Sequence, residues 1–190
     1  MRLACLLVVF SLLACAKPQG APDKVNAAQA IDAVSIAIMA HRRTYETLVV
    51  ERLSQAGAMQ VSPDYDAEPK HLPLPVQFLE RAGSDVAHSP EGDRLKFRLI
   101  SLDAINTSNL PTSEFEKEGM AKLAKKPDVP VRGIFFEKGR TYYQSLYADK
   151  AVSMGCVECH NAHPRSPRAD YQMGDVMGAL WVAIAIDEKQ

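Results

Sequence analysis

The segment VRGIFFEKGRTYYQSLY, residues 131–147, carries the clearest indication of tertiary structure in this chain. It contains two β-patterned runs, Val131–Glu137 and Arg140–Tyr147, which are separated only by Lys138 and Gly139. A two-residue connection that contains glycine joins neighbouring antiparallel strands in β-hairpins. The segment therefore predicts a hairpin, and with it an antiparallel sheet.

Further elements are predicted on both sides of this hairpin. They are strands at 95–99 and 179–186 and helices at 76–86 and 113–126. The last of these helices begins with a capping box, because Ser113 precedes Glu116 by three residues. Antiparallel strands with flanking helices predict an α+β fold.

Residues 24–56 are predicted to form one long helix that ends near Gly57. Mostly apolar residues recur at steps of three and four and form one stripe, which consists of Ile31, Val34, Ile38, His41, Tyr45 and Leu48. His41 lies on this stripe, so its side chain is expected to face inward. The remaining charged positions are expected on a solvated face, namely Arg42, Arg43, Glu46, Glu51 and Arg52.

Composition limits the classes of function that need to be considered. The chain has 190 residues, 47% of them hydrophobic, and it carries 22 Lys and Arg against 23 Asp and Glu. This balance fits one globular domain and leaves no basic excess with which to bind nucleic acid. No internal stretch reaches the length of a membrane-spanning helix, so only the N-terminus is expected to contact lipid.

The N-terminal residues predict export. Residues 1–14 have the layout of a signal peptide, with an early positive charge and an apolar core. The run that ends at Cys15, LLAC, resembles a bacterial lipobox, which predicts a lipidated Cys15 followed by a tether, together residues 15–23. The protein is then expected on the periplasmic side of the cell envelope, anchored to a membrane. In the alternative interpretation a signal peptidase cuts before Lys17 and releases a soluble periplasmic protein.

The sequence Cys156-Val-Glu-Cys159-His160 has the C-x-x-C-H spacing of covalent c-type haem attachment. Cysteines three positions apart reach the two vinyl groups on one porphyrin edge, and the histidine that follows reaches the iron. The motif predicts one covalent haem c, held through thioethers by Cys156 and Cys159, with His160 as the proximal ligand. Export agrees with this prediction, because c-type haem is attached outside the cytoplasm.

Two other uses of these residues fit the sequence less well. A thioredoxin-like redox pair requires a strand-to-helix context and leaves His160 without a role. Zinc could be imagined on Cys156, Cys159, His160 and His163, but adjacent side chains do not easily share one tetrahedral ion. Haem is the better prediction.

Several side chains are candidates for the iron's sixth position and for contact with the haem propionates. His41 is the first candidate for the distal ligand, and a core histidine or propionate partner is its ordinary alternative. The other candidate ligands are Met39, Met173 and Met177. His163 and Arg165 are predicted near the propionates, with Arg43 and Arg168 as further candidates, whereas His71 and His88 are expected in solvent.

Four segments together resemble the PAS-like c-type haem family, which was long catalogued as a domain of unknown function. They are HRRTYETLVV from residue 41, LPLPVQF from residue 72, FRLIS from residue 97, and CVECHNAHP from residue 156 with GDVMG from residue 174. The resemblance covers residues 24–190. It implies a PAS-like antiparallel sheet, a long N-terminal helix, and haem attached just before the last strand.

Three functions are compatible with such a domain. A lipid-anchored monohaem cytochrome would transfer electrons to a redox partner protein, and this is the main prediction. A haem-based sensor of redox state or gas is the alternative; no output domain follows the last predicted strand, so a separate signalling partner would be needed. An enzyme is not expected, because no acid–base pair stands out.

Overall fold

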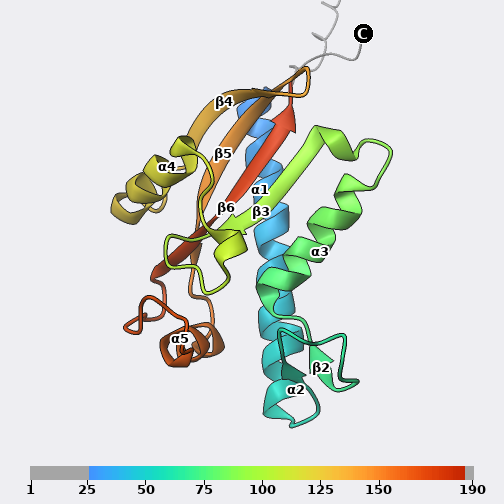
Figure 1. Cartoon of the computed structure of the whole chain (residues 1–190), viewed down its shortest axis with the longest axis vertical. Coiled ribbons are helices and arrows are strands. Elements are labelled where there is room, and N and C mark those ends of the chain that lie inside the picture. Colours follow the sequence, from blue (N-terminus) through green and yellow to red (C-terminus); the bar gives the residue numbers. More distant parts are fainter. Residues whose placement is uncertain (1–25, 187–190) are drawn as a thin grey trace, which may run out of the picture.

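The computed structural model describes residues 26–186 (Figure 1). Its elements are α1 (Ala27–Thr44), η1 (Tyr45–Val50), α2 (Glu51–Gln55), β1 (Gln60–Val61), β2 (His71–Leu72), α3 (Pro75–Ala87), η2 (Gly92–Arg94), β3 (Leu95–Ile100), η3 (Thr107–Asn109), α4 (Glu114–Lys125), β4 (Val131–Glu137), β5 (Arg140–Lys150), α5 (Met154–Ala162) and β6 (Val176–Ala185). The predicted signal peptide at 1–14, the tether at 15–23 and Cys15 lie outside the described residues. Within 26–186, no helix is long and apolar enough to cross a bilayer.

Four antiparallel strands form the main sheet in the order β3-β6-β5-β4. The predicted hairpin joins β4 to β5, and its two turn residues, Lys138 and Gly139, have φ of 49° and 80°. Positive φ at both central residues gives a turn whose twist matches that of the strands. The predicted α+β class, with its antiparallel sheet and long N-terminal helix, is confirmed.

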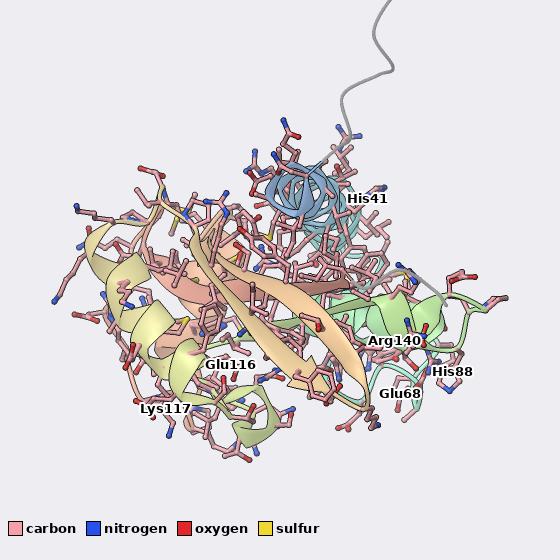
Figure 2. The ribbon with its side chains drawn as sticks, turned by 90° about the horizontal axis from the view of Figure 1, so that it is seen from above. His41, Glu68, His88, Glu116, Lys117 and Arg140 are labelled. Carbon is pink, nitrogen blue, oxygen red and sulfur yellow. The ribbon has the colours of Figure 1, made fainter. Side chains whose placement is uncertain are left out.

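Helices cover the two faces of this sheet. Figure 2 shows α1 on one side and α4 on the other. The α1 side includes α3 and is centred on Ile31, Leu79, Leu99, Leu180 and Val182. The α4 side is centred on Ile100, Met120, Leu123, Leu146 and Ala179. Alternate residues of β3 and β6 thus supply both cores, as the pleat of a strand requires.

The capping box at the start of α4 is confirmed. Ser113 Oγ accepts a hydrogen bond from the backbone N–H of Glu116, and Glu116 Oε2 accepts one from the backbone N–H of Ser113, both at 3.2 Å. The carboxylate also accepts hydrogen bonds from Arg98 Nη2 on β3, at 2.8 and 2.9 Å. The cap therefore also ties α4 to the sheet.

The long helix forms as predicted, but its buried face differs from the predicted one. α1, η1 and α2 are continuous, and Gly57 follows them with φ of 64°. Leu48 is 49% exposed, whereas Arg42 and Glu46 are only 8% and 3% exposed. The assignment of Arg42 and Glu46 to a solvated face is therefore wrong.

Geometry explains the error. The segment η1 is a π-helix, which takes more residues per turn than an α-helix and rotates the side chains after Tyr45. This turn accounts for the buried Glu46 and the exposed Leu48, whereas Arg42 precedes it and is buried against Asp149. Regular periodicity could not anticipate this shift.

Candidate functional site

Helix α5 places the three residues of the predicted haem motif on one surface. Ser153 is its N-cap, and Ser153 Oγ accepts a hydrogen bond from the backbone N–H of Cys156 at 3.1 Å. Residues at i, i+3 and i+4 share one helical face, which here are Cys156, Cys159 and His160. Cys156 is half-buried, Cys159 is exposed, and both are free thiols. The two sulfurs and the imidazole are therefore presented together.

The side of α5 that carries Val157 anchors the helix to the end of the sheet. Val157 is buried there and packs with Ala151, Tyr171 and Met177. Asn161 holds the returning chain through both of its amide atoms: Asn161 Nδ2 donates to the carbonyl oxygen of Tyr171, and Asn161 Oδ1 accepts from the backbone N–H of Tyr171, each at 2.9 Å. This arrangement fixes the helix that carries the motif.

His160 is half-buried beside Tyr171, whose ring lies edge-on at 5.8 Å between centroids and 89° between planes. Burial lowers the pKa of His160, and the neighbouring charges of His163 and Arg42 lower it further. The neutral ring is the form that ligates a metal. Burial and the nearby carboxylate of Asp103, which accepts the phenol hydrogen bond at 3.1 Å, raise the pKa of Tyr171 to about 12. Tyr171 therefore stays protonated next to the histidine.

A buried charge cluster, made of Arg42, Glu46, Asp149 and Ser153, lies where the long helix meets α5. Arg42 Nη1 approaches Asp149 Oδ1 to 3.1 Å without the alignment of a hydrogen bond. Ser153 Oγ donates to Glu46 Oε1 at 2.5 Å, and Cys156 Sγ lies 3.8 Å from the same oxygen. Burial raises the pKa of Asp149, opposed by the charge of Arg42 and reinforced by that of Glu46. The cluster thus joins the long helix to β5 and to the N-cap of α5, next to Cys156.

Unpaired polar atoms gather at this place. Among residues 26–186, buried side-chain atoms without a hydrogen-bond partner are Arg42 Nε, Asp149 Oδ1, His160 Nδ1 and His71 Nδ1. Three of these four belong to the charge cluster or to the motif. Because buried polar groups in native proteins are nearly always hydrogen-bonded, their concentration indicates a further polar group at this site. The residues fit a c-type haem, with two thiols for its vinyl groups, an imidazole for its iron and a guanidinium for a propionate.

Comparison with known proteins gives a family for the chain. The family model for Tll0287-like proteins matches residues 23–185. This chain belongs to the Tll0287-like family. A structure titled the crystal structure of the cyanobacterial heme-protein Tll0287 superposes on this member with a TM-score of 0.50 and 15% sequence identity, over 87% of this chain and 100% of the other. No curated protein matched. The predicted membership of a haem-domain family is confirmed, and the structural likeness shows the fold.

In this Tll0287-like protein, the expectation that His41 faces inward is wrong. Its side chain is exposed, and its Nδ1 donates to the carbonyl oxygen of Ala37 at 2.7 Å (Figure 2). A carbonyl oxygen can only accept, so Nδ1 carries the proton and the neutral ring has its lone pair on Nε2. His41 directly precedes Arg42 in the long helix and is therefore next in sequence to the charge cluster.

The other predicted propionate contacts of this chain have different surroundings. The backbone N–H of Arg165 donates to His163 Nδ1 at 3.2 Å; His163 is half-buried and Arg165 is exposed. Arg43 is exposed. Arg168 pairs with two carboxylates, those of Asp170 and Asp175, and its guanidinium lies 4.3 Å from the Tyr171 ring centre.

The methionine candidates occupy three different environments. Met39 packs against the α1-side core, Met177 is buried beneath α5, and Met173 is 50% exposed. His88 is exposed as predicted, at the end of α3. His71 is half-buried instead of exposed, because it forms the short parallel strand β2 beside β1.

Some site residues have no clear signal in the sequence. Ser153 could have been found as an N-cap, since it precedes Cys156 by three residues. Glu46 and Asp149 could not, because each is buried by chain segments far away in sequence. Within residues 26–186, no three His, Cys, Asp or Glu side chains gather as ligands around a metal ion, so the residues of the zinc interpretation are not assembled.

Proposed function

We propose that this chain is an exported, lipid-anchored monohaem c-type cytochrome with a PAS-like fold, which exchanges electrons with a redox partner protein. The observation that carries the proposal is the common face of Cys156, Cys159 and His160 on α5, in a family with a solved heme-protein. Cys156 and Cys159 would hold the porphyrin and His160 its iron. When bound, haem c supplies one-electron chemistry. We propose no catalytic role.

The protein's own contribution is positioning and charge. Asn161 and Tyr171 hold α5 in place, which fixes the direction of the His160 ring. Arg42 brings a positive charge close to that ring, and this charge would favour the reduced state of an iron held by His160. Cys159 is exposed, so the side of α5 that carries it is accessible to a partner protein.

His41 remains the proposed distal ligand, now as an exposed side chain with Nε2 available. His163 and Arg165 remain the proposed propionate contacts, together with the unpaired Nε of Arg42. Met39 and Met177 are less suitable ligands because each is already packed within a core cluster.

Absorption spectra of the haem-loaded protein test the function. A low-spin six-coordinate iron in both ferric and ferrous states is expected for electron transfer. The H41A variant should lose the low-spin ferric spectrum. H88A is the matched control, because His88 is also exposed and its Nδ1 also donates one helical turn back, to Ser84 O at 2.7 Å. An unchanged spectrum in H41A would remove His41 from the iron.

A haem-based sensor acting through a signalling partner is the second candidate, and the position of η1 favours it. This π-helical turn carries Glu46, which receives the hydrogen bond from Ser153 at the start of α5. A movement of α5 would therefore be transmitted to the long helix through this hydrogen bond. High-spin ferrous haem that binds carbon monoxide, with altered hydrogen exchange in η1, would favour the sensor over electron transfer.

The proposed anchor at Cys15 is tested independently of haem. The mature protein should begin at Cys15, carry acyl chains by intact mass, and fractionate with membranes. C15S should be released or remain unprocessed. A mature chain that begins at Lys17 and carries no lipid would instead establish the soluble periplasmic alternative.

A further inference from the structure

The end of the sheet farthest from α5 exposes a group of large apolar side chains. We call Ile134, Phe136 and Ile186 the hairpin patch; their side chains are 64%, 72% and 41% exposed. Isolated exposed apolar residues are ordinary, but Ile134 and Phe136 lie on β4 and Ile186 directly follows β6, and these two strands flank β5. Their grouping therefore calls for a physical explanation.

Strand register places the three side chains on one face. Phe136 pairs with Thr141, and the backbone N–H of Ile186 donates to the carbonyl oxygen of Thr141 at 2.9 Å. Ile134 is two residues from Phe136 on β4, so both side chains point to the same side of the sheet. Ile184, two residues before Ile186, packs in the α1-side core. The hairpin patch is therefore the outer end of the α1-side face.

Helix α1 leaves this end of the face uncovered. Asp32, in the second turn of α1, binds Arg132 Nη2 through both carboxylate oxygens, at 2.8 and 2.9 Å. Beyond Arg132, β4 continues toward the hairpin turn while the helix reaches its first residue, Ala27. Figure 1 shows the start of α1 and the hairpin turn at the same end of the molecule.

The proposed anchor at Cys15, upstream of α1, brings a lipid surface within reach of this patch. Cys15 lies eleven residues before Asn26, and a fully extended chain of that length reaches at most about 40 Å. A lipid on Cys15 would hold this same end of the domain near the bilayer. We propose that the hairpin patch docks on the lipid surface, with Phe136 and Ile134 entering the interface and the exposed Lys138 at the headgroups. This inference rests on the proposed anchor.

The docked orientation directs the haem motif away from the membrane. Strand β5 runs from the hairpin turn at Arg140 to Lys150, close to the start of α5. Ten steps of about 3.4 Å place the two ends about 34 Å apart. The face with Cys159 and His160 would then be presented to the aqueous side, where a protein partner can reach it.

Spin-label accessibility tests the docking directly. The lipidated, haem-loaded full chain carries a nitroxide at position 136 (F136C) or at position 36 (I36C) and is reconstituted in vesicles of phosphatidylcholine and phosphatidylglycerol. Ile36 is the matched control, because it is 70% exposed and apolar but lies farther along α1. The ratio of oxygen to nickel-complex accessibility should be several-fold higher at position 136.

Each other outcome overturns the proposal in a different way. Equal, water-like accessibility at both positions in a lipidated chain overturns the docking and leaves the anchor intact. An intact mass without acyl chains overturns the anchor, and the docking with it. Spin–spin broadening at position 136 that persists without lipid indicates that a second copy covers the patch, and overturns the lipid assignment.

Discussion

The ion pairs Arg98–Glu116 and Arg42–Asp149 both connect a helix to the sheet, but they differ in how completely their polar atoms are hydrogen-bonded. Glu116 accepts hydrogen bonds from Arg98 and from the backbone N–H groups of Thr112 and Ser113. Arg42 and Asp149 approach to 3.1 Å and leave Arg42 Nε and Asp149 Oδ1 unbonded. Protein groups therefore satisfy the carboxylate of the first pair, whereas the second pair leaves two buried polar atoms without a hydrogen-bond partner.

This difference separates a structural use of buried charge from a functional one. A buried charge is stable only when its partners offset the loss of hydration. The Glu116 network achieves this with protein groups alone, at the cap of a helix remote from the motif. The charge cluster at Arg42 lies beside Cys156 and His160, where an additional group would complete it. The comparison predicts that the two pairs respond differently to substitution.

The largest effect on stability is expected at Glu116. E116A removes the capping carboxylate and leaves Arg98 and two backbone N–H groups without their acceptor, which should lower the free energy of unfolding by about 3 kcal/mol. E118A, on the same helix at an exposed surface pair with Lys122, should change it by less than about 0.5 kcal/mol. Urea unfolding measures both, and equal losses would contradict the structural role of Glu116.

The two N-cap serines should differ in what they disturb. S153A removes the cap of α5 and the hydrogen bond to Glu46, which should cost about 2 kcal/mol and alter the absorption spectrum of the haem-loaded protein. S113A removes only the cap of α4, at a cost of about 1 kcal/mol, with the spectrum unchanged. An absorption spectrum that is unchanged in both variants would contradict a role of Ser153 at the haem site.

Loss of charge at Arg42 should shift the redox equilibrium. R42Q removes a positive charge close to His160 and should lower the midpoint potential by about 60 mV, which is a tenfold change in a one-electron equilibrium. R43Q removes the same charge from an exposed neighbour, where solvent and salt screen it. Spectroelectrochemical titration compares them, and equal shifts would show that burial of Arg42 has no influence on the iron.

The smallest effect is expected at Asp32, a surface carboxylate remote from the motif. The hydrogen bond from Tyr147 lowers its pKa below 3.8, burial opposes the shift, and Arg132 adds to it. A lowered carboxyl pKa stabilises the fold above 3.8, and this stabilisation is lost as the pH falls through the folded-state value. D32N should therefore cost less than about 1 kcal/mol at pH 7, and the difference should vanish in acid. Unfolding curves recorded from pH 7 downward would contradict this if the difference stayed constant.

Local signals made much of this molecule predictable. The Lys138-Gly139 turn and the Ser113–Glu116 capping box depend on residues close in sequence, and both form as expected. The face shared by Cys156, Cys159 and His160 follows from helical spacing alone. In such places the physics that determines the structure acts within a few residues, so the sequence is sufficient.

The charge cluster was missed because its causes are not local. Arg42 is buried by Asp149, which is more than one hundred residues away, and charged residues are rarely buried without such a partner. The π-helical turn also moved Glu46 inward. An apolar stripe predicts burial only when the helix is regular and the partner surface is apolar, and neither condition holds beside α5.

Intact mass and peptide mapping of the protein, expressed in a host that attaches c-type haem, determine whether haem is covalently bound at Cys156 and Cys159. We expect a denaturation-resistant gain of one haem, located on the peptide that contains Cys156 and Cys159, and its loss when both cysteines are replaced by alanine. A folded protein from the same host with no added mass and two alkylatable thiols at these positions would contradict it.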